Sequence, residues 1–160
     1  MEQFDIAVWH DSSIVIDCFK LDDLIGSREN FLSVFRHDED CTYAEARKVI
    51  STKKDNPIRV AIQMLYYGLV ENYTARNGVF ETGIMVMRPK EFHHSELRKL
   101  WWDHVNTFSC RDQLSLPYAV WKTKTSVGIL EGRGHQNAYS EFRGHKHSRF
   151  STANPLLKID

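Results

Sequence analysis

The chain has 160 residues, enough for one domain with a hydrophobic core, and its apolar (42%) and charged (26%) contents are ordinary for a globular protein. Lysine plus arginine (21) equals aspartate plus glutamate (21), which argues against nucleic acid as a partner and requires any anion site to be local. The three cysteines are odd in number and widely spaced, so we expect no disulfides. No leader is visible and no apolar run approaches the roughly 18 residues of a membrane span, so we expect a cytoplasmic protein.

The N-terminal quarter alternates short apolar runs with polar turns. Residues 4–9 (FDIAVW) and 14–16 (IVI) are predicted strands, separated by the polar turn HDSS. Residues 21–25 predict one helical turn that ends at Gly26, and residues 31–35 predict a further strand.

Two helices are predicted next. Thr42 and Glu45 have the spacing of a capping box, which predicts a helix to about residue 54. Asn56 and Pro57 predict the start of another helix. Its apolar residues recur three and four positions apart, and we expect the face that they form to lie in the core. These residues are Ile58, Ala61, Ile62, Leu65, Tyr66 and Leu69.

A buried central strand is predicted over residues 83–87 (GIMVM), because five uncharged residues in a row suit a strand covered on both faces. An amphipathic helix follows over residues 93–108. It carries Trp101 and Trp102, which, like the later Trp121, are suited to serve as a platform for a sugar.

The last part of the chain predicts one more helix and one more strand. Ser109 and Asp112 form a second capping box, and Pro117 should kink the helix that they open or begin a new one. Residues 125–130 predict a strand. From residue 131 the composition changes to Gly, Arg, His, Asn and Ser without periodicity, which predicts a loop or a ligand-ordered segment.

Strands alternate with helices along the chain, so we expect an α/β fold with a mixed, mostly parallel sheet flanked by helices. The composition divides the chain into an α/β domain over residues 1–130 and a C-terminal segment over residues 131–160, which we expect to pack on the site or to close it.

The order of these elements predicts one pocket. A strand that ends at Arg88 and a helix that starts at Asp112 would direct polar groups to the same place. An arginine at the end of an apolar strand needs a partner, and Glu81 is the candidate. Arg111 and Lys146 are candidates for holding phosphate oxygens through charge-assisted hydrogen bonds.

Three further residues are candidates for binding substrate. Gln113 follows Asp112, and Gln63 lies near the apolar face of its helix, so both amides are placed to bind hydroxyl groups. His37 follows the end of a predicted strand.

Asp11 is the strongest single candidate for a metal ligand. A carboxylate at the end of a strand suits Mg²⁺ or Mn²⁺, and an imidazole of His145 or His147 can complete the shell together with substrate oxygens. Two simpler interpretations stay open: Asp11 caps a turn, and the histidine-rich tail is a solvated loop.

Several segments resemble the glycosyltransferase-like, or hexosyltransferase-like, domain family of bacterial polysaccharide loci and plant Golgi proteins. The most specific are CTYAEA at residues 41–46 and RDQLS at residues 111–115, and the resemblance runs from about Phe4 to Val127. It implies polysaccharide biosynthesis through transfer of a hexose from a nucleotide-diphosphate sugar, expected to be a UDP-sugar, to a glycan acceptor.

The order of motifs is also similar to that of glycogenin-like transferases with the type A nucleotide-sugar fold. By this resemblance, Asp11 matches the first metal-binding acid, and Mn²⁺ or Mg²⁺ is the implied cofactor. Glu81 begins the strand beside the sugar, and Asp112 with Gln113 opens the helix that touches it, so these three are the implied catalytic residues. His145 or His147 matches the late metal ligand.

Two departures from that pattern leave alternatives open. Ser13 stands where the second metal-binding acid is expected, and the chain begins at the metal strand, so it resembles only the C-terminal portion of the type A fold. The enzymatic alternative is a metal-dependent phosphoesterase that uses His10, Asp11 and the tail histidines. The other alternative is a non-catalytic sugar-binding or scaffold remnant.

Overall fold

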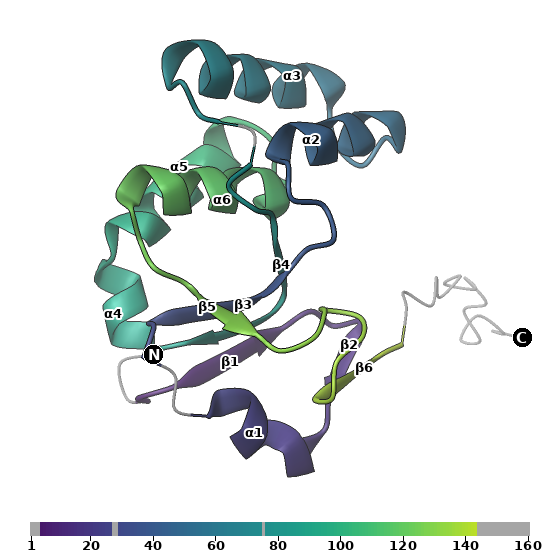
Figure 1. Ribbon diagram of the computed structural model, residues 1–160, viewed down its shortest axis with the longest axis vertical. Helices are drawn as coiled ribbons and strands as arrows, with labels where there is room; N and C mark the ends of the chain where they lie inside the picture. The colour runs from purple at the N-terminus through teal and green to yellow at the C-terminus, as the bar shows by residue number, and fades with distance from the viewer. Residues whose placement is uncertain (1–3, 27–28, 75, 144–160) are drawn as a thin grey trace, which may run out of the picture.

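The computed structural model describes residues 4–26, 29–74 and 76–143 (Figure 1). Its main sheet has four strands in the order β1-β4-β3-β5. β1 (Ala7–His10) and β3 (Leu32–Arg36) pair antiparallel with β4 (Phe80–Met87), and β5 (Gly128–Leu130) pairs parallel with β3. The α/β class is confirmed and the sheet is mixed, but the expectation of mostly parallel strands is wrong.

The antiparallel pairing of β3 and β4 follows from the connection between them. The chain leaves β3, passes through α2 (Thr42–Ser51) and α3 (Pro57–Leu65) beyond one end of the sheet, and returns beside β3 in the opposite direction (Figure 1). Helices that alternate with strands therefore do not by themselves produce parallel neighbours. β4 nevertheless lies between β1 and β3, as a buried central strand should.

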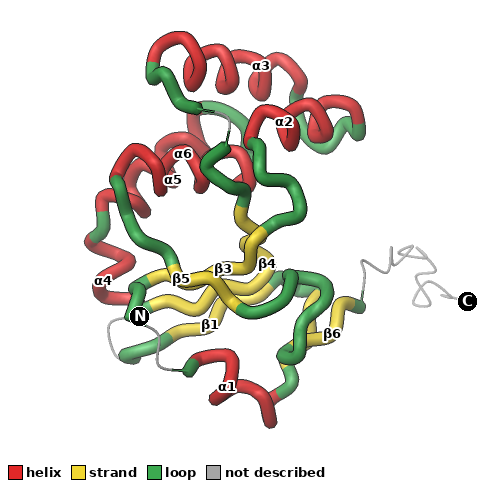
Figure 2. Tube along the Cα trace, viewed as in Figure 1, coloured by secondary structure: helices red, strands yellow, loops and turns green. Residues whose placement is uncertain are grey.

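Both faces of the main sheet are covered. On one side lie α4 (Pro89–His94), α5 (Glu96–Thr107) and α6 (Asp112–Thr123) (Figure 2). Ser95 caps α5 and separates it from α4, so the helix predicted over residues 93–108 is divided in two. α6 continues through Pro117 as one helix, so no new helix begins there.

The opposite side of the sheet carries smaller elements. The 3-10 helix η1 (Cys18–Lys20) runs into α1 (Leu21–Ile25), and β2 (Ile14–Ile16) forms a second sheet with β6 (Ser140–Phe142). The prediction of an irregular segment after residue 130 is wrong for β6, a three-residue strand too short to show an alternating pattern. None of the helices in the described ranges combines the length and the apolar composition needed to cross a membrane.

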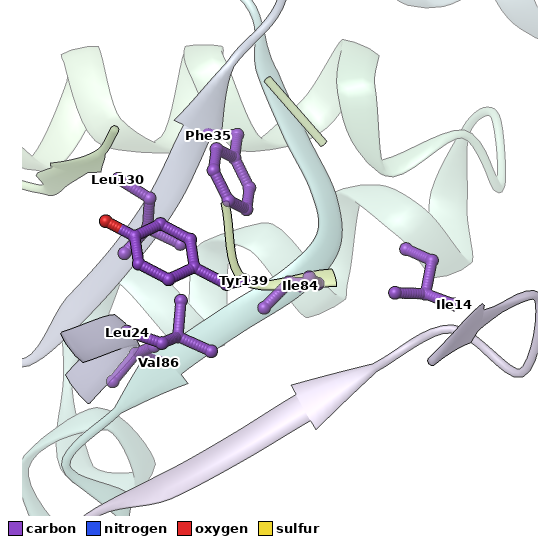
Figure 3. Close-up of a cluster of buried hydrophobic side chains, with 7 residues drawn as sticks. All are labelled: Ile14, Leu24, Phe35, Ile84, Val86, Leu130 and Tyr139. Atoms are coloured by element: carbon purple, nitrogen blue, oxygen red, sulfur yellow. The ribbon is translucent and has the colours of Figure 1, made fainter. Parts of the chain in front are cut away.

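Two apolar clusters fill the space on either side of the sheet. Toward α1, the buried side chains are Ile14, Leu24, Phe35, Ile84, Val86, Leu130 and Tyr139 (Figure 3). Toward α5 and α6, Val34 and Met85 of the sheet pack with Leu97 and Leu116. Because Tyr139 belongs to the first cluster, residues beyond 130 contribute to the core of the domain.

The face of α3 that packs against the protein is not the predicted one. Val60 and Gln63 of α3 are fully buried, and so is Tyr67 in the turn that follows the helix. The Gln63 amide donates to the Tyr67 hydroxyl (2.9 Å) and accepts from the N–H of Ser109 (3.3 Å), so its polar atoms are satisfied inside the protein. Four of the residues expected in the core are between 52% and 77% exposed: Ile58, Ile62, Leu65 and Leu69. The helix is apolar on two faces, and spacing alone selects the wrong one.

Neither predicted capping box forms, and both hydroxyls make long-range contacts. Cys41, not Thr42, is the N-cap of α2, and the buried Thr42 hydroxyl lies 3.0 Å from that of Tyr73. Arg111, not Ser109, is the N-cap of α6. Ser109 donates to the Asp55 carboxylate (2.5 Å), which ties the start of α6 to the connection between α2 and α3.

β4 is irregular where it passes β3. Val34 pairs with Met85, but Phe35 pairs with Glu81, so the β3 register skips Thr82, Gly83 and Ile84. On its other side β4 remains paired with β1 as far as Ile84. Such a bulge redirects side chains locally, and this one lies beside the end of β1.

Candidate active site

A polar pocket of about 300 Å³ opens where β1 ends and where β4 and α6 begin. We call this the carboxylate pocket. Asp11 follows β1, Glu81 and Thr82 belong to β4, and Arg111 and Asp112 open α6. The other lining residues are Trp9, Ser13, Ile14, His37, Gly83, Gln113, Gly134, His135 and Phe142. The structure thus brings Asp11 and Asp112, which are far apart in the sequence, to one pocket.

Asp11 is fixed in the turn between β1 and β2. Its Oδ1 accepts hydrogen bonds from the backbone N–H (2.9 Å) and the hydroxyl (3.0 Å) of Ser13. Its own N–H donates to the carbonyl of Gly83 (2.8 Å), which anchors the turn to the irregular part of β4. The side chain therefore caps a turn and lines the pocket at the same time. The preceding His10 is exposed and is absent from the pocket lining.

Asp112 is the first residue of α6 and is half-buried beside the start of β4. Its Oδ1 accepts from the N–H of Gln113 (3.0 Å), and the Thr82 hydroxyl donates to its Oδ2. Burial raises the pKa of the Asp112 carboxyl above its usual value; the Gln113 N–H and the Arg111 cation oppose this rise, and the charge of Asp11 adds to it. The two aspartates are therefore close enough to interact electrostatically.

Arg111 supplies the cationic part of the pocket. Its Nη2 donates to Oε1 of Gln113 (3.2 Å). Its Nε is buried and has no hydrogen-bond partner among the residues that the structure describes. A guanidinium that lines a pocket is suited in kind to bind the oxygen atoms of an anion.

The segment after β5 contributes a further part of the wall. Nδ1 of His135 lies 3.9 Å from Oε1 of Glu81, whose side chain is mostly buried. Gly134 permits this close approach, because a Cβ atom at position 134 would overlap the Glu81 carboxylate. Arg133 forms an ion pair with Asp38 and holds the turn in place.

Two predicted binding residues lie away from the pocket. Arg88 follows the opposite end of β4 from Glu81 and forms an ion pair with Glu91 (3.7 Å), so its expected pairing with Glu81 and its expected approach to Asp112 are wrong. The start of β4, not its end, lies next to the N-terminus of α6. Gln63 is buried between helices, where it binds Tyr67 and Ser109 as described above. His37, in contrast, does line the pocket.

Trp9, Thr82 and His135 line the pocket without having been predicted. Trp9 lies two residues before Asp11, so the alternation of side chains along a strand could have identified it. Thr82 faces the same pocket as its neighbour Glu81 only because of the irregular register of β4, which leaves no pattern in the sequence. The position of His135 at the pocket depends on the return of the chain after β5, which the local sequence does not predict.

The predicted metal site falls only partly within the described residues. His145, His147 and the predicted phosphate ligand Lys146 lie outside them. In the part of the chain that is described, no group of three or more His, Cys, Asp or Glu side chains could hold a metal ion. The carboxylate oxygens of the pocket are suited in kind to a hard cation, so substrate oxygens or residues outside the described ranges would have to complete the coordination.

Comparison with known protein families gives one match. The family model described as TOD1/MUCI70, glycosyltransferase-like domain, matches residues 2–136. These residues include the whole lining of the carboxylate pocket except Phe142. No curated protein and no solved structure matches the chain.

Proposed function

Because the chain belongs to the TOD1/MUCI70 glycosyltransferase-like domain family, we propose that it transfers a hexose from a nucleotide-diphosphate sugar to a hydroxyl group of a glycan. One observation carries this proposal: Asp11 and Asp112 share a pocket with Arg111 and Gln113. Carboxylates and an amide suit the hydroxyls of a sugar, and a guanidinium suits phosphate oxygens. A nucleotide sugar presents both kinds of group.

The order of the pocket elements supports a finer proposal. A strand leading to Asp11, a strand beginning at Glu81 and a helix beginning at Asp112 follow one another as in the type A nucleotide-sugar fold. We therefore propose that the domain is the C-terminal portion of such a fold, and that the donor is a UDP-sugar.

In the proposed reaction, an oxygen atom of the glycan bonds to the anomeric carbon of the hexose while the bond from this carbon to the diphosphate breaks. The diphosphate leaves with the electron pair, and the guanidinium of Arg111, which lines the pocket, would donate hydrogen bonds to it. Asp112 is suited to accept the proton of the glycan hydroxyl, because its pKa is raised. Glu81 and Gln113 would hold hydroxyl groups of the hexose.

Asp11 would hold a divalent cation, Mn²⁺ or Mg²⁺. When bound, such a cation neutralises charge on the diphosphate leaving group. Ser13 occupies the position of a second acid, but its two hydrogen bonds to Oδ1 fix the direction of the Asp11 carboxylate. His145 or His147 remains the proposed further ligand.

The proposal can be tested with the full chain, MnCl₂ and UDP-glucose or UDP-galactose, by measuring the release of UDP with and without a glycan mixture. Asp11→Ala is expected to lower the rate at least about 100-fold, because it removes a charged group that acts on the leaving diphosphate. Asp103→Ala changes an exposed aspartate of α5 and should retain the wild-type rate. Calorimetry with UDP and Mn²⁺ should show binding that Asp11→Ala loses.

Unchanged turnover in Asp11→Ala would contradict the proposal, and so would a wild-type chain that neither binds UDP nor releases it. Release of phosphate from simple esters without any requirement for a sugar would favour a phosphoesterase. His10 does not line the carboxylate pocket, which argues against that alternative.

A further inference from the structure

A second cavity adjoins the carboxylate pocket. Its volume is about 360 Å³, and it shares Trp9, Thr82 and Asp112 with the carboxylate pocket. Its remaining lining residues are Met85, Phe92, Arg98, Trp101, Trp102 and Val105, from β4, α4 and α5. We call it the aromatic pocket. It opens onto the same carboxylate, Asp112, to which we assign the proton of the acceptor.

The indole rings of this pocket differ in how tightly they are held. Trp101 packs edge-on against Phe92, with ring centroids 6.4 Å apart and planes at 72°. Trp102, the next residue of α5, is 61% exposed, and Trp9 is 46% exposed. One ring is therefore fixed in the wall, and two others leave broad apolar surfaces open to a ligand.

The aromatic pocket also contains polar atoms. Arg98 donates from Nε to the carbonyl of His93 (2.9 Å), which positions its guanidinium at the pocket wall. Thr82 and Asp112 lie at the shared wall. A hydrocarbon ligand would cover the Arg98 guanidinium and the Asp112 carboxylate without offering them a hydrogen-bond partner, which is unfavourable.

The ligand that fits must therefore present an apolar face and polar edges together. A pyranose ring does so, because its C–H bonds gather on its faces and its hydroxyls project from its rim. Sites with aromatic walls and a few fixed polar groups are typical of small organic ligands, and the volume suits roughly one or two sugar rings.

We propose that the aromatic pocket binds the terminal sugar of the glycan acceptor, with one face of the ring on the exposed indole of Trp102 and a hydroxyl directed to Asp112. This inference rests on the proposed transfer reaction, in which the donor occupies the carboxylate pocket. The wall formed by Trp9, Thr82 and Asp112 then lies between the two substrates, and Asp112 touches both.

Binding can be tested without turnover. Saturation-transfer NMR on the full chain would use methyl β-glucoside, methyl β-galactoside, cellobiose and lactose as probes, with hexanol as an apolar probe. We expect signals from the ring C–H protons of at least one sugar, and their loss in Trp102→Ala. Phe19→Ala removes an aromatic ring that is 93% exposed on η1, away from both pockets, and should retain the signals.

Kinetics gives a second measurement. Trp102→Ala should raise the KM for the glycan about ten-fold with a much smaller change in kcat, because it removes a stacking surface and no reacting group. Trp101→Phe keeps an aromatic ring in the pocket wall, so it should change the KM much less than Trp102→Ala does.

The outcomes separate this inference from the proposed function. Sugar signals that disappear in Trp102→Ala support the pocket even if no UDP-sugar is turned over, a result that would contradict only the transferase proposal. If transfer is observed and Trp102→Ala changes neither the sugar signals nor KM, the aromatic pocket is not the acceptor site. Signals from hexanol but from no sugar would overturn the inference and indicate an apolar partner.

Discussion

Asp112 experiences opposing influences on its ionisation at the start of α6. Burial and the charge of Asp11 favour the protonated carboxyl, whereas the Gln113 N–H and the Arg111 cation favour the carboxylate. Burial outweighs the opposing groups, so the pKa lies above its usual value of 3.8. The charged form is therefore unfavourable for folding, as is common for groups whose ionisation serves function.

We expect Asp112→Asn to stabilise the fold at pH 7 while it removes transfer activity. The folded chain keeps the proton to a higher pH than the unfolded chain, so stability falls as pH rises from 3.8 through the folded-state pKa. Asparagine removes this effect and still offers an oxygen to the Gln113 N–H. The melting temperature at pH 7 should rise by about 2–4 °C.

The gain should vanish below pH 3.8, where the carboxyl is protonated in both states. Asp103→Asn, at an exposed site on α5, should leave the melting temperature unchanged. A lower melting temperature for Asp112→Asn at pH 7 would show that the carboxylate stabilises the fold.

Which pocket residues the sequence could predict depends on what positions them. Asp11 and Asp112 each lie at the boundary of an element, and turn and helix signals predict such boundaries. Thr82 and His135 reach the pocket through the irregular register of β4 and the return of the chain after β5, which are properties of tertiary structure. The position of Arg88 does not follow from the local sequence, because the direction of β4 relative to α6 depends on strand pairing.

At the level of single elements, α3 shows that apolar residues at helical spacing are not always buried. Val60→Ala is expected to lower the free energy of unfolding by roughly 2 kcal/mol, because it leaves a cavity in a fully packed site. Ile62→Ala removes more apolar volume, but its side chain is 52% exposed, so the loss should be no more than about 0.5 kcal/mol. Urea unfolding followed by circular dichroism would measure both. Similar losses would show that the outer face of α3 is covered in solution.

The starts of the helices show how much of the fold the sequence predicts. Asn56 and Pro57 do start α3, and the Asn56 side chain accepts from the N–H of Ile58 (2.9 Å). Thr42 and Ser109 carry an equally good capping signal, yet their hydroxyls contact Tyr73 and Asp55. A hydroxyl is satisfied by either kind of partner, so packing decides between them. The sequence therefore predicts where most elements lie more reliably than what their polar side chains bind.

At the scale of the whole molecule, an aromatic cluster joins the π-helical turn η2 (Tyr66–Val70), which continues α3, to α5 and α6. Tyr67 stacks on Tyr118 with centroids 4.1 Å apart, and His104 stacks on the same ring at 4.7 Å. Nδ1 of His104 lies 3.0 Å from the Tyr67 hydroxyl. Burial lowers the pKa of His104 below its usual 6.5, although the charges of Glu71 and Asp103 favour its protonation.

The stability of the domain should therefore decrease as the pH falls below 6.5. In that range the unfolded chain binds a proton at His104 that the folded chain does not yet bind, and the loss ends once the folded-state pKa is passed. His104→Gln removes this titration, so its stability should vary less with pH, even if repacking lowers it at pH 8. Urea midpoints between pH 5 and pH 8 would measure the difference.

The exposed His93 of α4 provides the control, since His93→Gln should keep the pH dependence of the wild type. If His104→Gln loses stability on acidification as steeply as the wild type, a different group is responsible for the acid sensitivity.

The β3 register passes over Thr82, Gly83 and Ile84 of β4. The geometry of the pocket therefore depends on the length of β4 as well as on the pocket carboxylates. Deleting one residue between Glu81 and Met85 would turn the preceding part of β4 by one step of the pleat, so the buried ring of Phe80 and the carboxylate of Glu81 would exchange faces. Among relatives of this chain, an alignment gap at this point should mark proteins that keep the scaffold and have lost the chemistry.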